Sequence, residues 1–339
     1  MKSKRVIYID VIRVVAMILV VLAHACSVRI ATPDHSFSWS VTNVLVGITE
    51  VAVPMFFMIS GATILNSKKT TNVGYLFKHR LKRVIIPFIV WSIISAYPVS
   101  KIDGVFNIHQ FLVTVSLIFH QPVLMAYWFI YSLFGLYLIS PFIKLLVDHM
   151  NKSLLNYLLL LWMIGDIILP AIGQFTPPAI VNAFSLYSMA KIILSSYLGY
   201  FVMGYLLTHD TKLKFNLPKY VSIIALLFVI KVAVRFIPAQ SPWAFLNIAS
   251  SLSTPVIAVM LFMCFKSFEG KYSNWFTKSI EFVAPLTYGI YLSHGLIINF
   301  VGKFISPNNY PVIFLATLVF SIIMIYIIRK IPVIKNLLA

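Results

Sequence analysis

Long apolar runs separated by short polar segments make up almost the whole chain. Each run is about 20 residues long, which is the length of helix that crosses the hydrocarbon core of a bilayer. A protein with several membrane spans, built as one helical bundle, is therefore the expected fold. We expect ten spans, at about residues 7–28, 41–65, 84–100, 124–147, 154–172, 190–207, 219–237, 246–265, 280–300 and 311–329.

The composition supports this interpretation. Hydrophobic residues make up 60% of the chain and charged residues 11%, against about 45–50% and about 25% in soluble domains. An ordinary soluble protein and a disordered one are both excluded. The predicted fold class is all-α: a polytopic membrane bundle of about ten transmembrane helices, with residues 1–339 forming a single domain. The short apolar segment 108–122 is expected to be interfacial or re-entrant.

The basic residues fall mainly on one side of this topology. With the N-terminus in the cytoplasm, 20 of the 27 Lys and Arg residues lie in cytoplasmic segments and three lie in external loops. This bias follows the positive-inside rule, so both termini are predicted to be cytoplasmic. The net charge of +18 is then explained by topology, and no nucleic-acid partner is expected.

The first span contains three ionisable residues, Asp10, Arg13 and His24. Such groups are costly in a membrane unless they face protein or a cavity. Asp10 and Arg13 are three residues apart and can pair on one helix face. His24 follows Arg13 by about three turns, or about 16 Å, on the same face. The pattern indicates either a helix-end ion pair plus a core histidine, or a polar stripe that leads into the membrane.

A basic segment, Lys78-His-Arg80-Leu-Lys82-Arg83, precedes the third span. One interpretation is a topology anchor that contacts anionic lipid. The other is a phosphate clamp, because Arg80 and Arg83 are three residues apart on a helix and guanidinium groups suit phosphate oxygens.

Three further features have both a structural and a functional interpretation. The aromatic string with Trp128 and Tyr131 is either an interfacial belt or a cavity wall. His294, in the ninth span, forms a structural hydrogen bond or contacts substrate. The intramembrane charges Lys231 and Arg235 could line an external vestibule, and snorkelling also explains Arg235.

Redox and metal chemistry find little support in the sequence. The two cysteines, Cys26 and Cys264, are predicted near opposite membrane faces, so no disulfide is expected. No cluster of potential metal ligands has a convincing spacing, and no metal is expected.

Five strings, in order, are similar to the motifs of a known family. They are Tyr8-Ile-Asp10-Val-Ile-Arg13 with His24, Val53-Pro-Met-Phe-Phe-Met-Ile-Ser-Gly61, Arg80-Leu-Lys-Arg83-Val-Ile-Ile-Pro87, Tyr127-Trp-Phe-Ile-Tyr131 with Tyr137-Leu-Ile-Ser-Pro141, and Tyr288-Gly-Ile-Tyr-Leu-Ser-His294. On these strings the chain resembles the acyltransferase-3 family of integral membrane O-acyltransferases. It is most similar to the short, single-domain type, such as the enterobacterial-common-antigen O-acetyltransferase. Where the family commonly has Leu-Asp-Gly-Leu-Arg-Gly near the N-terminus, this chain keeps Asp and Arg but lacks the glycines.

The resemblance implies an enzyme that moves an acyl group, usually acetyl, from cytoplasmic acyl-CoA to a hydroxyl of a glycan or lipid-linked sugar. Acetyl-CoA is the implied donor. His24 would act as a general base or would carry the acyl group itself. The expected site residues are His24, Arg13 and Asp10 for catalysis, Arg80, Arg83 and Lys82 for acyl-CoA, and Trp128, Tyr131 and His294 for the substrate.

Two other classes of protein compete with this interpretation. A secondary transporter or exporter of a glycan or small anion would explain the intramembrane charges, but such folds often contain internal repeats, and none is visible here. A membrane sensor or scaffold would not need Arg13 and His24 on one face. The expected location is a bacterial cytoplasmic membrane. The expected partners are acyl-CoA, the sugar acceptor and membrane lipids, with a monomer and a homo-oligomer both open.

Overall fold

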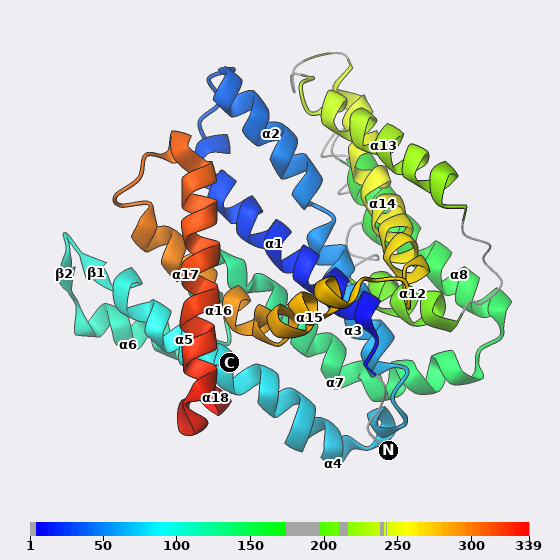
Figure 1. The fold of residues 1–339 in the computed structure, drawn as a ribbon, viewed down its shortest axis with the longest axis horizontal. Coiled ribbons are helices and arrows are strands. Elements are labelled where there is room, and N and C mark those ends of the chain that lie inside the picture. The colour runs from blue at the N-terminus through cyan, green and yellow to red at the C-terminus, as the bar shows by residue number, and fades with distance from the viewer. Residues whose placement is uncertain (1–4, 174–196, 210–215, 238–240, 242, 339) are drawn as a thin grey trace.

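The computed structural model describes residues 5–173, 197–209, 216–237, 241 and 243–338, and this part of the chain is almost entirely helical (Figure 1). The first half contains α1 (Ile7–Ile30), α2 (Phe37–Thr49), α3 (Ala52–Ile64), α4 (Val73–Tyr75), α5 (Lys82–Val99), α6 (Ile108–Ser116), α7 (Trp128–His149), α8 (Lys152–Met163) and α9 (Leu169–Gly173). The second half contains α12 (Leu198–His209), α13 (Leu217–Val234), α14 (Asn247–Ser267), α15 (Asn274–Val283), α16 (Thr287–Val301), α17 (Tyr310–Lys330) and α18 (Pro332–Leu338).

Shorter elements join or interrupt these helices. Two are π-helical segments, η2 (Leu76–Leu81) and η4 (Ile164–Ile168). The 3-10 turns are η1 (Lys68–Thr71), η3 (Met125–Tyr127), η5 (Ala244–Leu246), η6 (Ala284–Leu286) and η7 (Pro307–Asn309). Strands β1 (Lys101–Ile102) and β2 (Val105–Phe106) form one antiparallel hairpin, with Lys101 opposite Phe106.

Eight helical stretches in the described residues are long and apolar enough to cross a membrane. The all-α bundle is thus confirmed, with two differences from the ten predicted spans. The span predicted at 190–207 lies partly outside the described residues. The span predicted at 280–300 is divided by η6, which contains Pro285, because proline removes a backbone donor and interrupts a helix. The segment predicted to be interfacial forms α6, whose nine residues are too few to span a bilayer.

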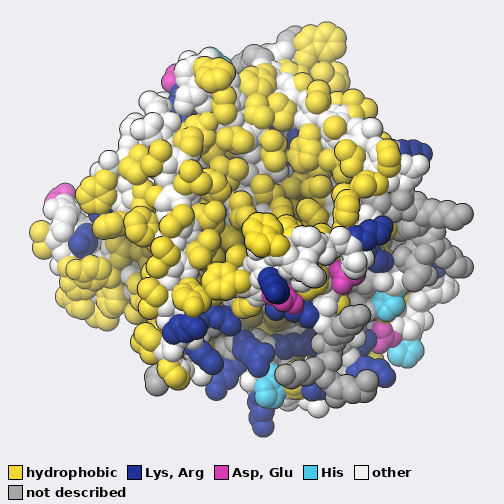
Figure 2. All heavy atoms as spheres, in the orientation of Figure 1, with side chains coloured by type: hydrophobic (Ala, Val, Ile, Leu, Met, Phe, Trp, Pro, Cys, Tyr) yellow, Lys and Arg dark blue, Asp and Glu magenta, His cyan; other side chains and the backbone are white. Residues whose placement is uncertain are grey.

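The exterior is apolar over a broad area. Figure 2 shows hydrophobic side chains covering most of one face, with Lys and Arg gathered along the edge near the N-terminus and α4. Large apolar side chains such as Phe142 (69% exposed) and Val229 (65% exposed) face outward. A soluble monomer rarely exposes so large an apolar area, whereas lipid contact explains it.

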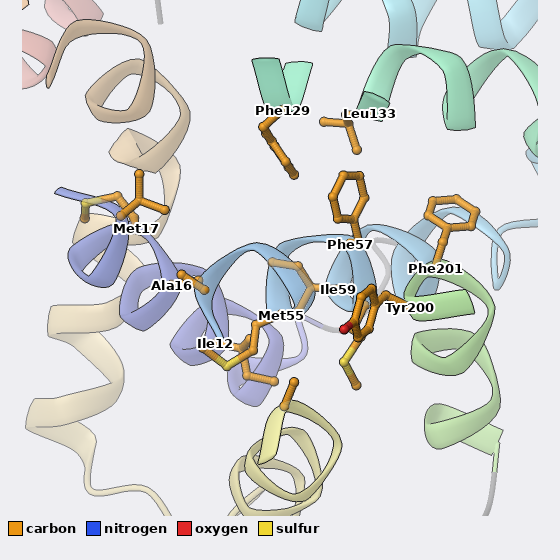
Figure 3. Close-up of a cluster of buried hydrophobic side chains, with 14 of the residues drawn as sticks. Ile12, Ala16, Met17, Met55, Phe57, Ile59, Phe129, Leu133, Tyr200 and Phe201 are labelled. Atoms are coloured by element: carbon orange, nitrogen blue, oxygen red, sulfur yellow. The ribbon is translucent and has the colours of Figure 1, made fainter. Parts of the chain in front are cut away.

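Helix α1 is central to the bundle and packs against α2, α3, α16 and α17. Its first turn is fixed by the Glu269 carboxylate, which accepts hydrogen bonds from the backbone N–H groups of Ile7 (3.2 Å) and Tyr8 (2.8 Å). These groups have no partner within the helix, so the distant carboxylate caps it. Figure 3 shows Ile12 and Ala16 of α1 beside Met55 of α3 in the buried core.

Helices α3 and α12 approach each other closely at two glycines. A Cβ atom on Gly61 would lie 1.7 Å from the carbonyl oxygen of Phe201, and one on Gly204 would lie 1.8 Å from that of Met58. Only glycine permits this backbone contact, which is typical of small residues between membrane helices. The Val53–Gly61 string therefore ends at a point where two helix backbones are in contact.

Candidate active site

The carboxylate of Asp10 lies between two arginines near the start of α1. It accepts from Arg5 Nε at 2.5 Å and from Arg13 Nη1 at 2.6 Å. The predicted pair of Asp10 and Arg13 is confirmed, and Arg5 is a partner that the sequence did not reveal because it precedes the helix. The Asp10 side chain is 8% exposed and that of Arg13 is 33% exposed. The buried carboxylate therefore holds Arg13 in place while its guanidinium remains accessible.

A cavity of about 200 Å³ lies beside Arg13, between α1, α3, α5, α7 and α16. Part of its lining is polar and part is aromatic. The polar side chains are Arg13, Ser60, Thr63, Tyr137, Thr287 and Tyr288. The apolar and aromatic ones are Phe56, Ile59, Val84, Phe129, Leu133 and Tyr291. A cavity lined by both polar and aromatic side chains suits a ligand that carries polar groups along an apolar chain.

Tyr137 connects the cavity to the basic segment before α5. It lines the cavity together with Ser60 of α3 and Arg13 of α1, and its hydroxyl interacts electrostatically with Arg13 and Arg80. Tyr288, on the opposite wall, donates to the Val84 carbonyl at 2.6 Å. The two tyrosines thus link α7 to α3 and α16 to α5 around the cavity. The sequence strings contain both residues, but nothing in their spacing showed that they face Arg13.

The cations of the basic segment, residues 78–83, differ in whether they contact the protein or are exposed. Arg80 lies in the π-helical segment η2, where it donates to Thr70 Oγ1 at 2.7 Å and lies 5.8 Å from the Tyr75 ring centre. Lys82 and Arg83, at the start of α5, are exposed. The sequence suggested two equivalent guanidinium groups. The structure shows one that is held against the protein and one that is open to a ligand.

His24 and His294 lie together, although 270 residues separate them in the sequence. Their ring centres are 5.1 Å apart. His294 is fully buried, and its Nδ1 lies 2.5 Å from the carbonyl oxygen of Tyr291. Because a carbonyl only accepts, Nδ1 carries the proton and Nε2 has a free lone pair. Nε2 is buried without a hydrogen-bond partner among the described residues. The fold thus brings His24 next to a buried histidine whose Nε2 is unpartnered among the described residues.

The two aromatic residues predicted to contact substrate lie outside the cavity lining. Trp128 packs against Phe129 and Tyr197, with ring centres 6.4 and 5.5 Å away. Tyr131 packs on Phe88 and donates its hydroxyl to backbone carbonyls in the segment after α6. On α7 the cavity is lined instead by Phe129, Leu133 and Tyr137.

Neither thiol is paired, and the described residues offer no metal site. Cys26 is buried, Cys264 is half-buried, and both are free. Among the residues that the structure describes, no three His, Cys, Asp or Glu side chains are arranged to hold a metal ion.

The comparisons with known proteins agree with the geometry. A family model described as an acyltransferase domain, that of the acyltransferase-3 family, matches residues 6–330. No curated protein and no solved structure matches the chain. The family match extends from the start of α1 to the end of α17 and includes every residue of the cavity. The chain belongs to the acyltransferase-3 family and is a multi-pass membrane acyltransferase.

Proposed function

We propose that the protein moves an acyl group, acetyl in the first place, from cytoplasmic acyl-CoA to a hydroxyl of a cell-envelope glycan or lipid-linked sugar. The proposed location is a bacterial cytoplasmic membrane, with both termini in the cytoplasm. The observation that carries the proposal is the order of groups along α1 and α16. Arg13 and Tyr288 line the cavity, and His24 and His294 form a pair about three turns further along α1 and about two turns further along α16.

The donor would enter from the end of the bundle that carries the basic segment. Arg83 and Lys82 are exposed there and suit the phosphates of CoA, while Arg80 is fixed by Thr70. The pantetheine arm would follow the cavity past Arg13. About 16 Å of helix separates Arg13 from His24, a span that an extended arm covers. The thioester then lies beside the histidine pair.

The reaction needs one proton to be moved. As the acceptor oxygen attacks the thioester carbon, His24 removes the hydroxyl proton. The carbon–sulfur bond breaks, and the imidazolium returns the proton to the leaving thiolate, which gives the ester and free CoA. The Nε2 lone pair of His294 has no partner among the described residues and lies in the ring next to His24. A hydrogen bond from a His24 N–H group to this lone pair would fix which nitrogen of His24 is the base. A covalent acyl-histidine on His24 is the alternative route.

The decisive test uses purified protein in lipid nanodiscs with labelled acetyl-CoA. Wild type releases CoA and transfers label, and His24→Ala lowers turnover by a factor of about 10²–10⁴. His120→Ala, at an exposed histidine in the segment between α6 and η3, is the matched control. Near-normal turnover by His24→Ala removes the catalytic role. Label trapped on His24 in the absence of acceptor identifies the covalent route.

The orientation has a separate test. A reporter fused after Leu65 should be cytoplasmic, and reporters near Pro33 and Pro307 should be external, because the positive-inside count requires it. An external signal after Leu65 reverses the side from which the donor enters.

A further inference from the structure

Three aromatic rings in the cavity lining contact one another. They are Phe56 of α3, Phe129 of α7 and Tyr291 of α16, and all three belong to the cavity lining. The ring centres are 5.7 Å apart for Phe56 and Phe129, 5.6 Å for Phe129 and Tyr291, and 6.5 Å for Phe56 and Tyr291. Each pair is in direct contact at these distances. The aromatic triad is therefore a closed triangle of rings.

The aromatic triad lies between Arg13 and the histidine pair. Along α16, Tyr288 lines the cavity, Tyr291 follows one turn later, and His294 follows after a further turn. The ring of Tyr291 contacts that of His294 at 5.6 Å, and the His294 ring contacts that of His24 at 5.1 Å. On α16 the Tyr291 ring thus stands between Tyr288 of the cavity lining and His294, which contacts His24.

The three rings differ in their freedom to move. Tyr291 is 5% exposed and donates its hydroxyl to the Ala126 carbonyl. Phe129 is 6% exposed and packs on Phe57 at 4.7 Å; Figure 3 shows these two phenylalanines pointing toward each other. Phe56 is half-buried, faces the cavity and has no polar group to anchor it. Rotation of Phe56 is thus the least costly way to open the triangle.

We propose that Phe56, Phe129 and Tyr291 select the acyl group of the donor by its width. This inference rests on the proposed function, because it requires an acyl thioester to travel from the cavity to His24. The part of the pantetheine arm next to the sulfur is an unbranched two-carbon unit, so an opening that holds this unit also passes a straight acyl chain. A branched acyl group adds a methyl at the point of passage and needs a wider opening than rotation of Phe56 provides, because Phe129 and Tyr291 are packed and anchored.

Butyryl-CoA and isobutyryl-CoA form a matched pair of donors for the test. They contain the same atoms and differ only in branching. In nanodiscs, wild type should turn over butyryl-CoA faster than isobutyryl-CoA. Phe56→Ala should raise the ratio of kcat/KM for isobutyryl-CoA to that for butyryl-CoA by about tenfold or more, the scale on which an apolar site discriminates a single carbon group.

Two variants control for unfolding and for nonspecific effects. Phe56→Leu keeps most of the side-chain volume and should raise the same ratio by a smaller factor. Phe142→Ala removes a phenylalanine from the exposed face of α7, where it is 69% exposed, and should leave the ratio unchanged.

The outcomes separate this inference from the proposed function. The width filter is the selection of the acyl group by Phe56, Phe129 and Tyr291. It is overturned if wild type and Phe56→Ala prefer butyryl-CoA over isobutyryl-CoA by the same factor. The proposed function stays intact in that case if release of CoA from acetyl-CoA still depends on His24. The width filter is also overturned if Phe56→Ala uses acetyl-CoA but neither four-carbon donor. Absence of turnover with every acyl-CoA in wild type rejects both.

Discussion

Two ion-pair networks in the bundle have the same arrangement of charges but differ in burial and in what their cations contact. In each, one carboxylate lies between two cations: Arg5–Asp10–Arg13 at 2.5 and 2.6 Å, and Lys231–Glu50–Arg235 also at 2.5 and 2.6 Å. In the first, the carboxylate is 8% exposed and Arg13 is 33% exposed. In the second, the lysine is 0% exposed and the carboxylate is 37% exposed.

The difference lies in what surrounds the cation. The ammonium group of Lys231 donates hydrogen bonds to Glu50, to Thr254 Oγ1 at 2.6 Å and to the carbonyl and hydroxyl oxygens of Ser250. It thereby joins α13 to α14 and to the end of α2, and it lines neither a vestibule nor the lipid surface. Arg13 has one carboxylate partner and faces the cavity. An intramembrane charge points to function when it borders a cavity, and to architecture when its donors are used within the protein.

The largest expected effect comes from Glu50→Gln. This change leaves the buried ammonium of Lys231 without its counter-charge, which costs about 3–5 kcal/mol of folding free energy. Unfolding measured in mixed detergent micelles should show the loss, while kcat/KM per folded molecule is retained because Glu50 does not line the cavity. The double variant Glu50→Gln/Lys231→Met should regain most of the stability. A stable Glu50→Gln variant would show that this network is not structural.

Asp10→Asn is the same carboxyl-to-amide change in the other network, and we expect the opposite result. Water can solvate both arginines, so the loss of stability should be smaller than that in Glu50→Gln. Arg13 loses the charge-assisted bond that fixes it, worth about 1.5–3 kcal/mol, so kcat/KM should fall about tenfold or more. The measurements are the stability and the acetyl-CoA turnover of both variants. If Asp10→Asn loses stability and keeps activity, the proposed difference between the two networks is wrong.

A third, smaller effect distinguishes the two arginines of the basic segment. Arg83 is exposed and available to phosphate, so Arg83→Ala should raise KM for acetyl-CoA about tenfold, and Arg83→Lys should rescue only in part because a point charge cannot replace the fork. Arg80 is bound to Thr70. Arg80→Ala should therefore also lower thermal stability, which Arg83→Ala should not. If wild type and Arg83→Ala have the same KM for acetyl-CoA, Arg83 acts only as an anchor that sets the membrane topology.

Local features of the fold and site followed from the sequence, and distant ones did not. Helical spans and the Asp10–Arg13 pair depend on composition and on a three-residue spacing, which the sequence states directly. The pairs Glu50–Lys231 and His24–His294 are set by how α1, α2, α13 and α16 pack, and no periodicity within one helix encodes that contact. The sequence also did not predict that Arg80 is partly buried while Arg83 is exposed. Arg80 lies in a π-helical segment, whereas the expected spacing assumed a regular α-helix.

The ion pair between Arg29, in the last turn of α1, and Asp34, in the loop that follows, is the reference for both networks and gives the smallest expected effect. Hydrogen bonds from the Arg29 guanidinium and the Ser36 backbone lower the pKa of Asp34 to about 2 from 3.8. The folded state thus prefers the carboxylate, so this contribution to stability is complete above about pH 4 and is lost as the pH falls toward 2. Asp34→Asn should remove that part of the pH dependence.

The measurement is thermal unfolding in detergent between pH 5 and pH 2.5, at low and high salt. The Asp34 carboxylate is 51% exposed, so water and salt should screen its pair with Arg29, and the difference between wild type and Asp34→Asn should shrink at high salt. The Glu50 network is held by a fully buried ammonium, so the loss in Glu50→Gln should hardly depend on salt. Equal salt dependence of the two variants would mean that burial of Lys231 does not separate an architectural ion pair from a surface one.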